Sequence, residues 1–173
     1  MSVDFNMQKI TSKLKSIKKY DIEGFVYDLS GMVHQLWFFH NKLIPEEDEN
    51  GDDTFYTPTP APKINQLAYF NLGHGYPKEL YGGHWCYIIN EFKTKYLIIP
   101  TTSLKDGKLI KESNFPIEIK DFENDSVTVA RVEEIRTIDK MRIFRGKPFY
   151  DILTSKEEII SKINENMYKP LTL

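Results

Sequence analysis

The spacing of apolar residues changes once along the chain, and the change separates a helical segment from a strand-rich one. In residues 1–45 apolar side chains recur every three or four positions, which is the period of an amphipathic helix. The first predicted helix carries its stripe on Met7, Ile10, Leu14 and Ile17. A second helix is predicted to begin after Asp21, a good N-cap residue. Its stripe runs along Phe25, Leu29, Met32, Val33, Leu36 and His40.

The two predicted helices are joined near Tyr20 and Asp21 and are expected to form a hairpin. Trp37, Phe38 and Phe39 make the second helix apolar on more than one side. A helix of this kind is not expected to stand alone, so we expect it to pack on the rest of the protein or on another subunit.

The next segment changes in composition. An acidic run over residues 46–53 is followed by closely spaced prolines up to Pro62, and neither composition buries apolar area. The sequence therefore predicts a helical N-terminal extension over residues 1–45, an acidic and proline-rich linker over 46–62, and a β-rich domain over 63–173.

From Ile64 onward the pattern shortens to β-rich runs. Five strands are predicted, at Gln66–Leu72, His84–Asn90, Tyr96–Thr101, Pro116–Lys120 and Ser126–Val132. Parallel pairing would need longer crossovers, so the short connections indicate a small, strongly curved antiparallel barrel. The predicted class is mainly β within α+β.

Two further elements are predicted after the strands. Residues 133–142 resemble a short helical turn, and Ser155 with Glu158 forms a capping box that opens a last helix. That helix carries Ile159, Ile163 and Met167 on one side.

Composition narrows the class of protein. The formal charge is −2 and the pI about 6.1, so any nucleic-acid site must be local. Cys86 is the single cysteine, which excludes an intramolecular disulfide, and its place in an apolar strand favours a buried, inert thiol. We expect no signal peptide and no membrane span, and therefore a cytoplasmic protein.

Candidate chemistry is concentrated in and just after one loop, within residues 71–103. The loop contains Gly73, Gly75, Gly82 and Gly83, which most simply allow positive φ angles. A strand ending in Leu-Gly leads into a G-x-x-x-E loop that ends at Glu79, and His84 opens the next strand. The strand after that ends in the P-x-T-S tetrapeptide of Pro100–Ser103.

These motifs resemble those of the MazF/PemK (CcdB/Kid-like) toxin family. Two later runs strengthen the resemblance, Asp125-Ser126-Val127 and the I-R-T-I-D-K run of Ile135–Lys140. The resemblance covers about residues 64–145. It implies an SH3-like barrel that forms a homodimer and acts as the toxin of a type II toxin–antitoxin system. It also implies metal-independent cleavage of single-stranded RNA by its own 2′-hydroxyl, without a cofactor, and inhibition by a cognate antitoxin.

The resemblance places the family's catalytic threonine at Thr102, whereas the usual arginine position is occupied by His84. An imidazole titrates near neutral pH, so His84 is suited to act as the base or the acid of transphosphorylation. Charge stabilisation would then move to Thr102, Ser103, the glycine-loop amides or Lys78. A strand-start histidine and a strand-end hydroxyl with purely structural roles are the alternatives.

The predicted substrate-binding residues also include three aromatic side chains that could stack on bases, Tyr76, Tyr81 and Trp85. Lys78 is predicted to lie near a phosphate, and Glu79 belongs to the same substrate-binding set. Either Trp85 or Cys86 must point inward, because neighbouring strand residues alternate.

Two other interpretations of these residues are weaker. A metal site on His74, Glu79 and His84 is disfavoured, because the loop supplies no third nitrogen or thiolate ligand. A structural pair holding a turn against the barrel is expected to explain Arg136 and Asp139.

Two other functions stay open from the sequence. A non-catalytic binding module of the same fold would explain the missing arginine at position 84. A gyrase-directed poison is the other alternative, although the motifs around His84 and Thr102 match the ribonuclease branch better. The sequence alone does not specify the RNA bases recognised.

Overall fold

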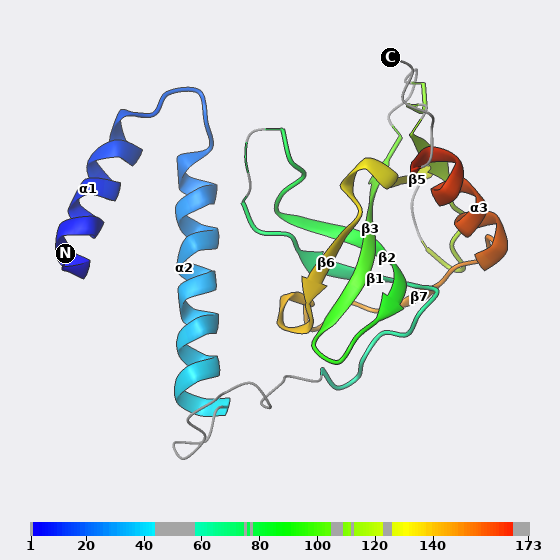
Figure 1. The fold of residues 1–173 in the computed structure, drawn as a ribbon, viewed down its shortest axis with the longest axis horizontal. Helices are drawn as coiled ribbons and strands as arrows, with labels where there is room; N and C mark the ends of the chain where they lie inside the picture. Colours follow the sequence, from blue (N-terminus) through cyan, green and yellow to red (C-terminus); the bar gives the residue numbers. More distant parts are fainter. Residues whose placement is uncertain are drawn as a thin grey trace. The chain divides into compact units, whose positions relative to one another are not determined.

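The structure is a computed structural model that describes residues 2–43, 58–74, 76, 78–104, 109–111, 113–122 and 126–167. The chain divides into two compact units, Met1–Pro45 and Glu46–Leu173 (Figure 1). Most of the predicted linker lies outside the described residues.

The first unit is helical. It contains α1 (Val3–Ser16) and α2 (Ile22–Phe38), and a π-helical turn, η1 (Phe39–Leu43), continues the second helix. The Asp21 carboxylate accepts a hydrogen bond from the Gly24 backbone N–H at 2.9 Å, which satisfies one of the free donors at the helix start. The predicted beginning of the second helix is therefore confirmed.

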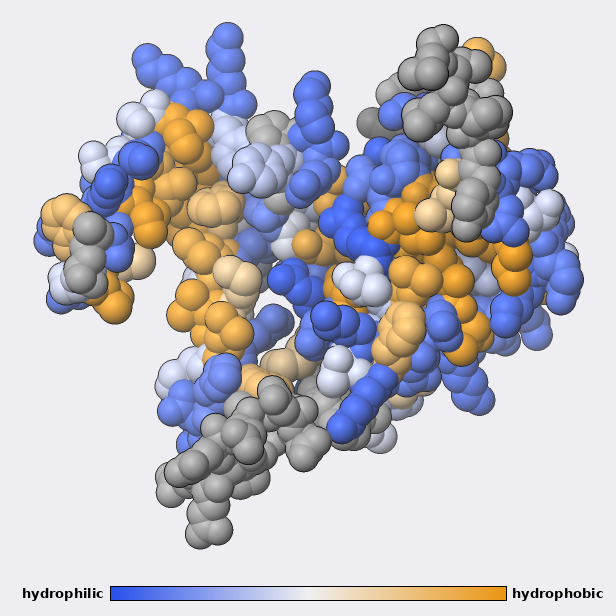
Figure 2. All heavy atoms as spheres, in the orientation of Figure 1, coloured by the Kyte–Doolittle hydropathy of each residue, from blue (hydrophilic) through white to orange (hydrophobic). Residues whose placement is uncertain are grey.

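Much of the apolar stripe of each helix is exposed, whereas Leu14, Phe25 and Leu29 are half-buried. Neither helix has a buried residue, and Figure 2 shows apolar side chains along both. The exposed apolar side chains include Val3, Phe5, Met7, Ile10, Val26, Met32, Val33, Leu36 and Trp37. An apolar surface of this extent is typical of a region that packs against a partner. The expected packing of the extension on the barrel or on another subunit stays a prediction.

The second unit is built on one antiparallel sheet. Its strands are β1 (Gln66–Asn71), β2 (Gly83–Glu91), β3 (Lys95–Ser103), β4 (Asn114–Pro116), β5 (Thr128–Arg131), β6 (Arg136–Asp139) and β7 (Tyr150–Asp151). They follow the order β4-β5-β3-β2-β1-β7, and β6 also pairs with β3. The helix α3 (Lys156–Met167) closes the unit.

The long strand β3 makes the sheet curl. One edge of β3 pairs with β2, whereas the other edge pairs with β6 along Lys95–Ile98 and with β5 along Thr101–Ser103. A bulge between Ile88 and Asn90 adds local twist to β2. The structure therefore confirms the predicted α+β class and a strongly curved antiparallel sheet (Figure 1).

Two apolar clusters lie on the two faces of the central strands. The first contains Leu67, Tyr87 and Ile99 and is covered by Ile159 and Ile163 of α3. The second contains Ala68, Phe70, Cys86, Ile88, Tyr96, Ile98, Ile138 and Ile143. Cys86 is fully buried there, and this burial raises the pKa of its thiol, so the expected inert cysteine is confirmed as a core residue.

Three sequence predictions need correction. The helical turn predicted over residues 133–142 is interrupted, because β6 lies between two 3₁₀ turns, η2 (Val132–Glu134) and η3 (Lys140–Arg142). Pairing with β3 provides hydrogen bonds that a short isolated helix lacks. The fourth strand lies earlier than predicted, and Met167 is exposed.

The capping box predicted for the last helix is confirmed in its first half. The Glu158 backbone N–H donates to Ser155 Oγ at 3.2 Å.

Within the described part of the chain, no helix is long and apolar enough to cross a membrane.

Two buried tyrosines should make the protein sensitive to alkali. Burial raises the pKa of Tyr87 to about 12, and the carboxylate of Glu157 adds to the effect. Burial, followed by the charge of Glu91, likewise raises the pKa of Tyr96 to about 12. An unfolded tyrosine ionises near pH 10, so the folded state holds more protons above that pH and stability falls between about pH 10 and pH 12.

Denaturant titrations at several pH values in this window measure the loss. Tyr87→Phe should flatten the pH dependence while lowering stability near neutrality, because the bond from Tyr87 Oη to Asn65 Oδ1 is lost. Constant stability from pH 9 to pH 12 would contradict the account.

Candidate functional site

The loop between β1 and β2 is closed by hydrogen bonds at its base. The Leu72 N–H donates to the Gly82 carbonyl at 2.8 Å, and the Gly82 N–H donates to the Gly73 carbonyl at 2.9 Å. Gly73 and Gly82 both have positive φ angles, as predicted from the sequence. This closed base fixes the position at which β2 begins, directly before His84.

Gly83 is needed for a different reason from the one predicted. Its φ is not positive, but a Cβ atom at this position would lie 2.3 Å from Tyr69 Oη and 2.7 Å from two ring carbons. The Tyr69 ring therefore covers the backbone next to His84, and only glycine leaves room for it.

Gly83→Ala is expected to destabilise the protein by about 1–3 kcal/mol, because the Tyr69 ring must move. Chemical denaturation followed by circular dichroism measures the change. Gly31→Ala is the control, because open space surrounds Gly31 in α2 and alanine favours a helix. Equal stability of Gly83→Ala and the wild type would show that the Tyr69 ring can move aside without loss of folding free energy.

His84 is held by one ring nitrogen. It pairs with Phe70 in the sheet, is half-buried, and its Nε2 lies 2.9 Å from the Tyr81 carbonyl oxygen. A carbonyl oxygen only accepts, so Nε2 carries the hydrogen. In the neutral ring, Nδ1 then has the lone pair that can take a proton.

The two threonines at the end of β3 differ in environment. Thr101 is buried, and its hydroxyl donates to the Trp85 carbonyl at 2.9 Å. Thr102 and Ser103 are exposed and pair with Val129 and Thr128 of β5. Of the two threonines, it is Thr102 that presents its side chain to solvent.

Strand register brings His84 and Thr102 to the same part of the sheet. The last ladder pair between β2 and β3 is Cys86 with Pro100, and His84 and Thr102 each lie two residues farther along, at the same end. Because side chains alternate, both share the face of Cys86 and Pro100. The Thr101–Trp85 bond keeps the two strands adjacent beyond the ladder.

The predicted substrate-binding residues of the loop are exposed. Tyr76 is 80% exposed and Tyr81 40%, and Lys78 and Glu79 also face solvent. Tyr81 contacts the ring of His74, with ring centroids 4.6 Å apart. The Glu79 carboxylate accepts a hydrogen bond from the Tyr76 N–H at 3.2 Å, so Glu79 also stabilises the turn of the loop.

Trp85 lies on the opposite face of β2 from His84. It packs edge-on against Tyr69, Phe122 and Tyr150, with ring centroids 5.1–5.3 Å apart. The structure thus separates Trp85 from the His84–Thr102 face and places it in an aromatic cluster beside the first core.

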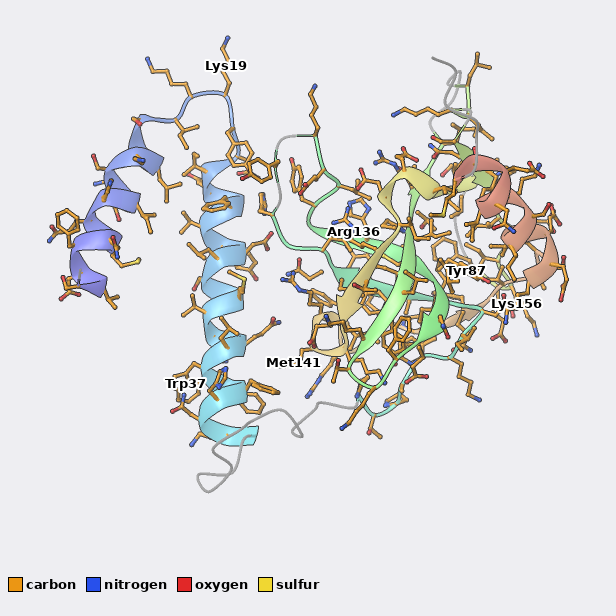
Figure 3. All side chains as sticks on the ribbon, in the orientation of Figure 1. Lys19, Trp37, Tyr87, Arg136, Met141 and Lys156 are labelled. Atoms are coloured by element: carbon orange, nitrogen blue, oxygen red, sulfur yellow. The ribbon has the colours of Figure 1, made fainter. Side chains whose placement is uncertain are left out.

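The predicted pair between Arg136 and Asp139 is wrong. Arg136 lies on β6 (Figure 3). It pairs instead with Glu134, where its Nε donates to the backbone carbonyl oxygen and its Nη2 to the carboxylate. The Asp139 carboxylate accepts from the Met141 N–H and starts η3. Both residues do have structural contacts, but with different partners from the one predicted.

Sequence reasoning missed two residues that shape the site. Tyr69 covers Gly83, and Arg142 lies at the base of the loop, with Nη1 3.5 Å from the Asn71 carbonyl oxygen. Arg142 is far from the loop in sequence. The bridge between Phe70 and Ile143 brings it there.

No protein-family model matches the chain, and no curated protein matches it. The resemblance to MazF/PemK toxins therefore rests on the sequence motifs alone.

Proposed function

We propose that the protein is a metal-independent endoribonuclease of the MazF/PemK type that cleaves single-stranded RNA. The observation that supports this most is the placement of His84 and Thr102 at the same end and face of neighbouring strands, next to an exposed loop. The curled sheet of this unit would then be an SH3-like barrel.

In the proposed reaction, the ribose 2′-oxygen forms a bond to phosphorus while the bond from phosphorus to the 5′-oxygen breaks. His84 Nδ1 takes the proton of the 2′-hydroxyl, because Nε2 is already engaged with the Tyr81 carbonyl. Water supplies the proton to the departing 5′-oxygen. The products are a 2′,3′-cyclic phosphate and a 5′-hydroxyl.

The protein must also stabilise the charge that develops on the phosphoryl oxygens. Thr102 is exposed on the face of His84, whereas Ser103, one residue farther along β3, lies on the opposite face, and Lys78 lies in the exposed loop. A hydroxyl donor and an ammonium group can together replace the charge stabilisation of an arginine. Tyr76 and Tyr81 then offer ring faces to unpaired bases.

The biological role proposed is that of a toxin in a type II toxin–antitoxin system. The protein would act as a homodimer, and a cognate antitoxin would cover the RNA-binding surface. Induced expression in a bacterial host tests this role: growth should stop for the wild type and continue for Thr102→Val.

The enzymatic proposal is tested by incubating the purified protein with mixed single-stranded RNA in EDTA and analysing the product ends. Cleavage that leaves a 2′,3′-cyclic phosphate is the expected result. Intact RNA that is nevertheless bound tightly would instead identify a binding module without catalysis.

A further inference from the structure

One peptide group of the loop between β1 and β2 holds the His84 ring. The Tyr81 carbonyl oxygen lies 2.9 Å from His84 Nε2, and the N–H of the same peptide, that of Gly82, donates to the Gly73 carbonyl at 2.9 Å. A trans peptide group is planar, and its N–H and carbonyl point in opposite directions. The Gly73 carbonyl therefore sets the direction in which the Tyr81 carbonyl faces the imidazole.

Gly73 is in turn held by the side chain of Asn71. The Gly73 N–H donates to Asn71 Oδ1 at 2.8 Å, and Gly73 has a φ of +72°, which side chains other than glycine rarely allow. The Asn71 backbone pairs with Gly83 in the ladder between β1 and β2, so Asn71 is anchored in the sheet. A strand residue thus carries the acceptor that orients the base of the loop.

Arg142 fills the space beside Gly73. A Cβ atom at Gly73 would lie 2.8 Å from Arg142 Nη1, and the same nitrogen lies 3.5 Å from the Asn71 carbonyl oxygen. The guanidinium therefore packs against the Cα atom of Gly73, and the glycine has little room to shift toward it. Asn71 and Arg142 together hold the beginning of a hydrogen-bonded series that ends at His84.

We propose that Asn71 is a positioning residue for the base of the proposed reaction. Through Gly73 and the peptide between Tyr81 and Gly82, it keeps the His84 hydrogen on Nε2 and leaves Nδ1 to take the 2′-hydroxyl proton. Hydrogen bonds in such a series polarise one another, so loss of the first weakens the last. The inference rests on the proposed ribonuclease function and adds the residue that selects which ring nitrogen reacts.

A purely structural role for Asn71 is the alternative. Asparagine commonly accepts a hydrogen bond from the backbone N–H two residues farther on, and such a turn closes many loops without a catalytic purpose. That role predicts a less stable loop base, but it predicts no change in which nitrogen of His84 carries the hydrogen. The tautomer of the imidazole therefore distinguishes the two roles.

NMR of the full chain with isotope-labelled histidine nitrogens, at mildly alkaline pH, reports which ring nitrogen is protonated. The spectrum of His84→Gln identifies the His84 signals by their absence. The wild type should show a single Nε2–H form, and Asn71→Ala should show a mixture of the two tautomers. Asn71→Asp retains an oxygen that accepts from the Gly73 N–H, so it should keep the wild-type tautomer.

Cleavage of single-stranded RNA by the same variants measures the consequence for the reaction. Asn71→Ala should lower kcat about tenfold, the value of one hydrogen bond, and leave KM nearly unchanged, because the exposed loop side chains are intact. Asn71→Asp should recover most of kcat. Asn90→Ala is the control, because it removes the bond from the Glu91 N–H to Asn90 Oδ1 at the far end of β2. It should leave both the tautomer and kcat unchanged.

The outcomes separate this inference from the proposed function. A wild-type His84 that carries its hydrogen on Nδ1 would overturn the positioning role, even if Asn71→Ala does not fold. An unchanged tautomer in folded Asn71→Ala would also overturn it, whatever the rate of cleavage. A tautomer that depends on Asn71, in a wild type that does not cleave RNA, would overturn the ribonuclease and support the hydrogen-bonded series.

Discussion

His84→Ala is expected to lower the rate of RNA cleavage by about 100- to 10,000-fold, the usual contribution of general acid–base catalysis. In the proposed mechanism His84 Nδ1 accepts the 2′-hydroxyl proton, because Nε2 is held by the Tyr81 carbonyl. Initial rates at saturating RNA measure the loss. His34→Ala, an exposed histidine of α2, is the matched control and should cleave normally.

His84→Gln separates chemistry from loop anchoring. A glutamine amide can still donate to the Tyr81 carbonyl but has no titrating base, so this variant should be nearly as inactive as His84→Ala. Substantial activity in His84→Gln would show that the histidine acts only by holding the loop.

Thr102→Val should be similarly impaired, because it removes an exposed hydroxyl on the face of His84. Thr102→Ser should recover most of the activity. Thr137→Val, an exposed threonine in β6, is the control and should match the wild type.

Glu91→Gln is expected to be among the most destabilising single changes, by about 3–5 kcal/mol. Lys140 Nζ lies 2.6 Å from Glu91 Oε1, and the lysine side chain is only 6% exposed whereas that of Glu91 is 40% exposed. Removing the carboxylate charge leaves the buried ammonium facing a neutral amide oxygen and the Tyr96 ring, 5.2 Å away, and no second carboxylate pairs with it among the described residues. Denaturant unfolding at neutral pH measures the cost.

The opposite substitution should cost much less. Lys140→Met removes the buried charge and leaves a carboxylate that water can reach, so its stability should lie near that of the wild type. The double variant Glu91→Gln/Lys140→Met should recover most of the stability lost in Glu91→Gln. Glu165→Gln, which breaks an exposed pair with Lys162, should have no measurable effect. Equal losses of stability in Glu91→Gln and Lys140→Met would contradict the expectation that the buried lysine, and not the exposed carboxylate, makes the pair costly to break.

The helix starts and the central strands could be predicted from the sequence because their signals are local. Asp21 and Ser155 cap helices as expected, and the runs before and after His84 form β1, β2 and β3. Periodicity and capping chemistry depend only on neighbouring residues.

Elements that depend on distant partners were harder to predict. β6 is only four residues long, which is too short for the alternation of apolar and polar residues to identify a strand. It forms because β3 offers a free edge for pairing. Gly83 looked like a loop glycine, yet its role depends on Tyr69 in another strand. Arg142 reaches the base of the loop only through the bridge between Ile143 and Phe70.

The predicted site was correspondingly mixed. The family resemblance points to His84 and Thr102, and strand register puts both at the same end and face of β2 and β3. Trp85 is predicted to stack on bases in the same site, but alternation along β2 puts it on the other face, within an aromatic cluster.

The central claim is that RNA is cut by its own 2′-hydroxyl at a site formed by His84 and Thr102. The most direct measurement places a single 2′-deoxynucleotide at the cleaved position of an RNA oligonucleotide and follows cleavage by the wild-type protein in EDTA. The account predicts that cleavage at that position stops while the oligonucleotide still binds. Continued cleavage at the deoxy position would contradict it.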